Sequence, residues 1–249
     1  MTSVNVLVRD SFEMIGATEN LQHFEVSPDC GIRFDSALWN RINAPLMQVY
    51  PDLLSLGNKR REPAGIIYEE PARRDFSNRL AQRWQFLFSG KFVLERKVSL
   101  SRSTSSIFDA DDFLKALVKF GLNVVNIASG LRGTRNIELN FAISGLKEKF
   151  ISPEILGRKT RGLYQCDTLG QPARGNFIAV EARDRMVEAL KAELFGFAKG
   201  VIGSFNSSPG VPAKLGTRLG IEVEDFDKLF FETLKTGLST FGVLNGPSR

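Results

Sequence analysis

Histidine, cysteine and long apolar runs are all scarce in this chain of 249 residues, and each scarcity excludes a class of protein. The two cysteines, Cys30 and Cys166, form no CxxC pair, which excludes a disulfide scaffold and a thiolate zinc site. No apolar run approaches the roughly 18–20 residues of a membrane helix. The N-terminal residues lack the basic-then-apolar pattern of a secretory signal. We therefore expect a soluble, cytoplasmic protein with no membrane partner.

His23 is the only histidine, so a histidine-based metal cluster is impossible and a nucleophilic triad could use no other imidazole. It lies in LQHFEV, an alternating segment typical of a strand, and we predict a structural role for it. The sequence also lacks GxxxxGK[ST] and a GxGxxG between a strand and a helix, the usual phosphate-binding loops. We expect no catalytic residue and no cofactor.

Two polar stretches could suggest chemistry but have simpler interpretations. The acidic run of RLGIEVEDFDKL is typical of the first turn of a helix, where carboxylates are favourable, so we predict no metal site. SFNSSPG has no base at hand and is typical of a linker.

Positive charge is unevenly distributed along the chain, although its formal net value is only +5. Gly57 to Arg102 holds eleven cations and five acids, and Leu131 to Gly175 holds eight cations and four acids. Ile221 to Lys235 has five acids and two cations. A basic centre of this kind is typical of a protein that binds a polyanion such as nucleic acid, although a solvated basic face would give the same pattern.

Hydrophobic periodicity predicts an alternation of strands and helices. Strands are expected around Val4–Val8 and at Lys91–Leu100, Ile137–Ile143 and Asn176–Val180. Helices are expected at Asp35–Val49, Asp75–Ser89, Asp111–Gly130, Arg183–Val201 and Glu224–Thr240. Loops are expected at Leu56–Pro71 and Gly203–Gly220.

This order predicts an α+β fold, with an RRM-like or ferredoxin-like palm of antiparallel strands and helices. We treat residues 1–249 as one domain, with thumb or loop insertions near 56–72 and 203–220. Most of the many phenylalanines belong to the core. Phe108 and Phe205, which lie in polar loops, are the candidates for stacking on bases.

Two stretches are similar to a known family. NIASGLRGTRNIELNFAISG (Asn126–Gly145), continued by FISPEILGRKTRGLYQ (Phe150–Gln165), resembles the segment after the central helix in the crRNA-binding backbone subunit of type I-F (Csy) CRISPR surveillance complexes. RLAQRWQFLFSGKFVLERK (Arg79–Lys97) is similar to the family's helix that ends in a small residue, a cation and Phe. The family usually continues with Trp-Arg-Asn-Arg, where this chain has Leu94-Glu95-Arg96-Lys97.

The resemblance covers about residues 75–165 and implies a shortened variant of a hand-shaped, non-enzymatic Cascade subunit in a prokaryotic cytoplasm. Several copies would form a helical filament along the crRNA for antiviral defence, with guide pairing selecting the target DNA and other Cascade subunits as partners. Phosphates would be held by cations and by turn N–H groups. The predicted RNA-binding residues are Arg79, Arg83, Lys91, Arg96, Lys97, Gly130, Arg132, Gly133, Arg135, Arg158, Lys159 and Arg161.

The acidic C-terminal helix gives a second prediction, because it could contact the basic patch of the next copy through Glu224 and Asp227. Three other functions remain open at this stage. They are a metal-independent crRNA-processing endoribonuclease that uses His23 or a Lys/Arg cluster, a single-copy end-capping subunit of the same complex, and a viral-type nucleocapsid protein that coats RNA.

Overall fold

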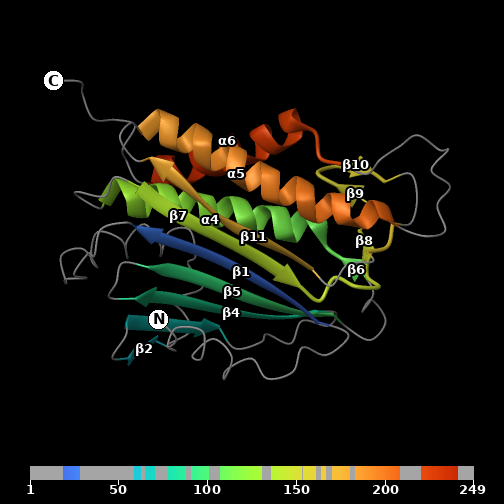
Figure 1. The fold of residues 1–249 in the computed structure, drawn as a ribbon, viewed down its shortest axis with the longest axis horizontal. Coiled ribbons are helices and arrows are strands. Elements are labelled where there is room, and N and C mark those ends of the chain that lie inside the picture. The colour runs from blue at the N-terminus through green and yellow to red at the C-terminus, as the bar shows by residue number, and fades with distance from the viewer. Residues whose placement is uncertain are drawn as a thin grey trace.

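A seven-stranded antiparallel sheet forms the base of the fold (Figure 1). Its strand order is β11-β7-β1-β5-β4-β3-β2. The strands are β1 (Glu19–Pro28), β2 (Lys59–Glu62), β3 (Gly65–Glu70), β4 (Asn78–Leu87), β5 (Phe92–Leu100), β7 (Asn136–Ser144) and β11 (Gly170–Ala179). The computed structural model describes residues 19–28, 59–62, 65–70, 78–87, 91–100, 107–130, 136–152, 154–160, 164–166, 170–179, 183–207 and 220–240.

Three long helices lie on one side of this sheet: α4 (Ala110–Gly130), α5 (Arg183–Gly203) and α6 (Val223–Thr240). A short 3-10 helix, η1 (Ser204–Ser207), follows α5. Beside the N-terminal end of α4 lie two small sheets, one of β6 (Ile107–Phe108) with β8 (Phe150–Ile151), the other a hairpin of β9 (Glu154–Ile155) and β10 (Arg158–Lys159). The α+β class predicted from the sequence is confirmed.

The connection β5–α4–β7 organises the centre of the sheet. Both β5 and β7 are antiparallel to β1, which lies between them, so β5 and β7 are parallel to each other. The helix α4 crosses over β1 to join them and packs on it through Phe113 and Phe120, which contact Phe24 of β1. This is a split β-α-β unit.

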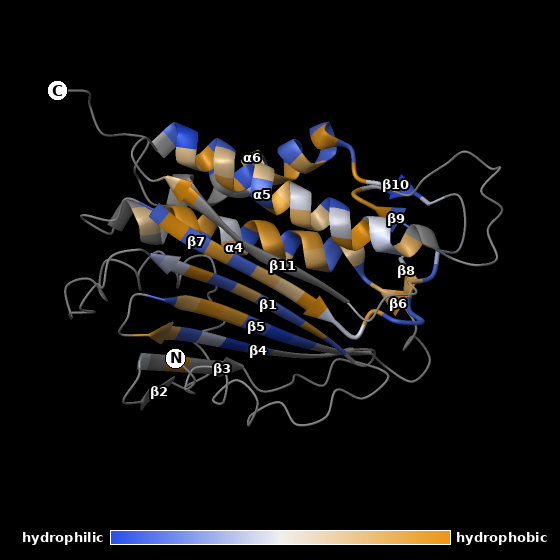
Figure 2. Ribbon diagram, in the orientation of Figure 1, coloured by the Kyte–Doolittle hydropathy of each residue, from blue (hydrophilic) through white to orange (hydrophobic). Residues whose placement is uncertain are grey.

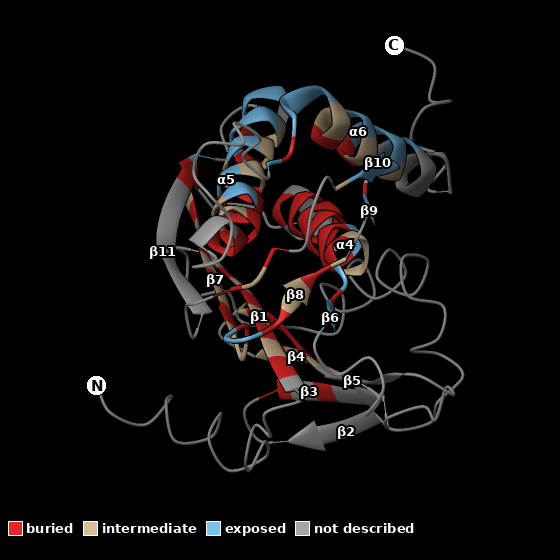
Figure 3. Ribbon diagram, turned by 90° about the vertical axis from the view of Figure 1, so that its right-hand side faces the viewer, coloured by how far each residue is buried: buried red, intermediate tan, exposed pale blue. Residues whose placement is uncertain are grey.

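Hydrophobic and hydrophilic residues alternate along strands such as β7 (Figure 2), and much of α4 and of the central strands is buried (Figure 3). In β7 the odd-numbered residues from Ile137 to Ile143 are buried and the even-numbered ones are half-buried. Stacked rings join the two layers, since Phe92 of β5 lies 5.2 Å from Trp84 of β4 and 5.7 Å from Phe120 of α4, centroid to centroid. This apolar, aromatic interface holds the sheet and helices together.

Several predicted elements are confirmed. The strands at Lys91–Leu100 and Ile137–Ile143 are present, as are the helices that we placed at Asp111–Gly130, Arg183–Val201 and Glu224–Thr240. The cap of α4 lies two residues before its predicted start, because the Asp109 carboxylate accepts the backbone N–H of Asp112 at 3.0 Å. The strand predicted at Asn176–Val180 is β11, which begins earlier, at Gly170.

Two predicted elements are wrong. The helix predicted at Asp75–Ser89 is strand β4, which pairs with β5 so that Trp84 lies opposite Leu94 and Phe86 opposite Phe92. Within the loop predicted at Leu56–Pro71, the described residues form the β2–β3 hairpin at one edge of the sheet. The predicted strand at Val4–Val8 and helix at Asp35–Val49 lie outside the described residues.

Candidate functional site: the charged far face of the sheet

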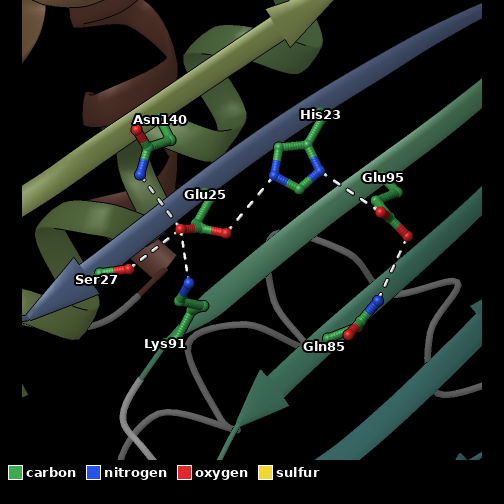
Figure 4. Close-up of polar contacts among 7 residues, drawn as sticks. All are labelled: His23, Glu25, Ser27, Gln85, Lys91, Glu95 and Asn140. Atoms are coloured by element: carbon green, nitrogen blue, oxygen red, sulfur yellow. Dashed lines mark hydrogen bonds and ion pairs between the residues drawn. The ribbon is translucent and has the colours of Figure 1, made fainter. Parts of the chain in front are cut away.

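A group of polar side chains lies on the face of the sheet that points away from the helices, here called the far face (Figure 4). Because successive strand residues point to opposite faces, burial of Phe24 against α4 places His23 and Glu25 on the far face. Glu95 of β5 lies opposite His23 in the register, and Asn140 of β7 lies opposite Glu25.

His23 lies between two carboxylates. Its Nε2 is 3.6 Å from Glu25 Oε2 and its Nδ1 is 3.5 Å from Glu95 Oε1, which are ion-pair separations longer than a good hydrogen bond. Burial works to lower the pKa of His23, but the two carboxylates outweigh it and raise the pKa to about 9. The imidazole therefore carries a proton at neutral pH.

Glu25 is the most connected member of the cluster. Its Oε1 is 2.9 Å from Lys91 Nζ, and it accepts hydrogen bonds from Asn140 Nδ2 at 3.2 Å and Ser27 Oγ at 3.3 Å. Burial works to raise the pKa of Glu25, but His23 and Lys91 outweigh it and lower the pKa to about 2. This carboxylate is therefore ionised throughout the physiological range.

The cluster is electrically balanced, with His23 and Lys91 offsetting Glu25 and Glu95. A general acid or base works best when its pKa lies near the operating pH, whereas the pKa of His23 is about 9 and that of Glu25 is about 2. Glu95 is also only 1% exposed, so a substrate cannot contact it without rearrangement. The geometry therefore favours the predicted structural role of His23. Within the described part of the chain, no three His, Cys, Asp or Glu side chains are grouped to hold a metal ion.

Arg96 is the clearest correction among the predicted RNA-binding residues. It lies on the helix-facing side of β5, where its side chain is 4% exposed. Its Nη1 donates to Gln22 Oε1 at 2.7 Å, and its Nη2 donates to both carboxylate oxygens of Asp112 at 2.9 and 3.0 Å. The guanidinium thus joins β1, β5 and the start of α4, and it is not available to a phosphate.

The two predicted base-stacking residues are also wrong. Phe108 is 1% exposed and Phe205 is fully buried, and their rings stack on each other with centroids 5.4 Å apart. Polar neighbours in the sequence suggested exposed loops. Instead, Phe108 lies in β6 and Phe205 in η1, and both belong to the core.

The other predicted residues lie in varied environments, and Lys91 is half-buried and forms an ion pair with Glu25. Arg83 is buried, Lys97 is half-buried and Lys159 is exposed. Arg158 forms a two-point pair with Asp225 at 2.6 and 3.1 Å, and Asp227 pairs with Lys191 at 3.2 Å, whereas Glu224 is exposed. The backbone of Arg79 lies in β4 opposite Ser99, and Gly130 ends α4. The remaining four, Arg132, Gly133, Arg135 and Arg161, lie outside the described residues.

Sequence reasoning missed Glu25 and Glu95 as partners of His23. Alternation already places His23 with Glu25, and Lys91 with Glu95, on one face of their strands. Their meeting depends on the pairing of β1 with β5, more than sixty residues apart.

Comparison of this chain with protein-family models, curated proteins and solved structures finds no match. None of the helices in the described ranges has the length and apolarity that a bilayer crossing requires.

Proposed function

We propose that this chain is a non-catalytic RNA-binding protein, and specifically the multi-copy crRNA-binding backbone subunit of a CRISPR surveillance complex of type I-F. One observation carries the proposal: the basic segment Gly57–Arg102 folds into adjacent strands on one flank of the sheet. Eight of its cations lie in β2, β4 and β5 or immediately before β5: Lys59, Arg60, Arg61, Arg79, Arg83, Lys91, Arg96 and Lys97. Arg83 and Arg96 are buried and Lys91 pairs with Glu25, so the proposal depends on the other five cations of this flank, whose clustering is typical of polyanion binding.

The topology supports an RRM-like palm. The split β5–α4–β7 unit with β1 between its strands is the type of unit from which ferredoxin-like sheets are built. The β2–β3 hairpin then extends the sheet beyond that unit, in place of the loop insertion expected from the sequence.

The charge distribution also supports contact between copies. In Figure 1 the acidic helix α6 lies near the top of the molecule and the basic strand β2 near the bottom. A head-to-tail contact of this kind repeats into an open filament. Glu224 is exposed on α6, whereas Asp227 already pairs with Lys191. Glu224→Lys should therefore weaken assembly on RNA, and Glu148→Lys, in an exposed turn, is its control.

The endoribonuclease alternative finds less support in the geometry. His23 is held between two carboxylates, one beside each of its ring nitrogens, so neither nitrogen faces an open site for RNA. A protonated imidazole also cannot act as a general base at neutral pH.

The test is purification of the protein with its bound nucleic acid, followed by sizing of the extracted RNA and measurement of the assembly mass. Several protein copies on a discrete guide-length RNA would support the backbone function. One copy per guide would indicate the end-capping subunit, and coating of RNA of any length would indicate a nucleocapsid protein. RNA cleavage that His23→Ala abolishes would indicate the endoribonuclease. A monomer free of nucleic acid would refute the proposal.

A further inference from the structure

Helix α6 carries an exposed aromatic side chain that the functions considered so far do not use. Three large apolar side chains are exposed among the described residues, and two of them, Val223 and Phe231, belong to α6. Phe231 is 42% exposed, although its ring packs edge-on against Phe230 and its centroid lies 4.9 Å from Lys191 Nζ. Aromatic side chains are enriched in contacts between proteins, so the surroundings of this ring indicate what it could meet.

Phe231 lies in a stripe of four exposed side chains along α6, here called the α6 stripe. Glu224, Lys228, Phe231 and Lys235 are all exposed, and their spacing of four, three and four residues places them on one side of the helix. The stripe spans about 16 Å along the helix axis. An acid therefore lies at its N-terminal end and a lysine at its C-terminal end.

The charges of the stripe are available to a partner. Asp227, which flanks the stripe, already pairs with Lys191 Nζ at 3.2 Å. By contrast, no ion pair within the described part of the chain engages Glu224, Lys228 or Lys235. The three charged members of the stripe can thus meet a second surface without first breaking a contact in their own fold.

A second copy of α6 in the antiparallel direction would match every member of the stripe. Glu224 and Lys235 lie equally far from its midpoint, as do Lys228 and Phe231. A two-fold axis at this midpoint places Glu224 opposite Lys235 of the second copy and Lys228 opposite Phe231 of the second copy, and each contact occurs twice. The first is an ion pair and the second a cation–π contact. A parallel arrangement would instead place like charges opposite each other.

We propose that two copies of this chain associate through an antiparallel contact between their α6 stripes when no RNA is bound. The contact goes beyond the proposed function and does not depend on RNA binding. One helix from each copy gives a small interface, so the dimer should be weak and reversible. The proposed filament contact also uses Glu224, and one Glu224 side chain cannot serve both contacts at once.

The test measures the mass of the nucleic-acid-free protein by sedimentation equilibrium over a range of protein concentrations. The wild type should show a reversible equilibrium between monomer and dimer that salt weakens. Glu224→Lys and Lys235→Glu should each lower the association constant by roughly tenfold, because each places like charges opposite each other at two symmetric sites. Phe231→Ala should lower it by about fivefold or more.

Combining the two charge reversals tests which residues face each other. The double variant Glu224→Lys/Lys235→Glu exchanges the two charges and should dimerise like the wild type. An equimolar mixture of the two single variants should form a heterodimer, because a lysine then faces a glutamate at both sites. The matched control is a mixture of Glu148→Lys with Arg185→Glu, which changes the net charges equally at exposed positions outside α6.

A wild type that stays monomeric at every concentration would overturn the dimer, as would a mixture that pairs no better than the control mixture. Weaker association in Glu224→Lys but not in Lys235→Glu would assign Glu224 to the head-to-tail contact with β2 and also overturn it. Should a charge reversal prevent folding, Glu224→Gln and Lys235→Gln remove the charges more gently and should each still weaken the dimer. Because no RNA is present, failure of the dimer leaves the proposed function untouched, whereas a protein that binds no RNA refutes that function alone.

Discussion

The histidine between two carboxylates predicts an unusually basic imidazole, and the chain is well suited to the measurement. Because His23 is the only histidine, its ring protons give the only histidine signals in a proton NMR spectrum. We expect these signals to titrate with a pKa of about 9, against an ordinary value of 6.5.

The contribution of this pKa shift to the stability of the protein follows from the linkage between protonation and folding. A pKa raised from 6.5 to about 9 corresponds to about 3 kcal/mol of stability, an upper value because Glu25 and Glu95 share the same interaction. The folded state binds the proton more tightly than the unfolded state. The contribution is therefore fully present below pH 6.5 and is lost as the pH rises through about 9.

At low pH the stabilising contribution of the cluster is lost through protonation of Glu25. Its pKa is lowered from 4.5 to about 2, so its contribution is present above pH 4.5 and is lost as the pH falls through about 2. Urea unfolding across the pH range should therefore show this cluster at full strength between pH 4.5 and 6.5. The two contributions describe one ion pair and do not add.

Variants identify the cause of the shift. Glu95→Gln and Glu25→Gln should each lower the pKa of His23, because each removes one of its two carboxylate neighbours. Glu138→Gln is the control. Glu138 lies on the same face of β7 as Ala142, which is opposite His23, and the two positions are four residues, or about 13 Å, apart along the strand. A wild-type His23 that titrates near 6.5, or a pKa that neither glutamate variant lowers, would refute the reasoning.

Further predictions concern packing, each read as the free energy of unfolding in urea. Gly196→Ala should stabilise α5 by about 0.5–1 kcal/mol, since the added Cβ has no atom of the described residues within 4 Å. Gly121→Ala places a Cβ 2.5 Å from Leu194 Cδ1 and should be the less stable of the two variants, and the reverse order would contradict this packing. Asn123→Leu should stabilise the protein by about 1–3 kcal/mol, because neither amide atom of this buried side chain has a hydrogen-bond partner among the described residues. A loss of stability would show that the amide is needed. Phe205→Ala should cost about 3–5 kcal/mol and leave RNA affinity unchanged under folding conditions, and a selective loss of affinity would restore its base-stacking role.

The segment around Trp84 shows how far the sequence could predict the fold. Phe76, Leu80, Trp84 and Leu87 recur at helical spacing, but Leu80, Trp84 and Phe86 also fit a period of two, so both patterns are present. Pairing with β5 decides between them, because it stacks Phe92 on both Trp84 and Phe86. That partner cannot be identified from the periodicity of the segment itself.

Arg96 and Phe108 show the same limit for the site. Alternation along β5 places Arg96 on the same strand face as Phe92 and Leu94, which are buried. This shared face indicated that Arg96 is buried too, but selecting residues by charge alone did not take it into account. Phe108 gave no such signal, since its burial depends on Phe113 and Phe205, which come from two different helical segments.

The position of β1 has a consequence for how the chain folds. This central strand pairs with residues 92–99 on one edge and 137–144 on the other. Both edges therefore stay unpaired until these later segments of the chain have been synthesised. Pairings of such long range close slowly, because the entropy of loop closure must be met before the contacts form. During that interval, a strand with two unpaired edges is open to association with other chains. Refolding should accordingly be slow and sensitive to protein concentration, with α4 locking β1 in place once β7 has joined the sheet.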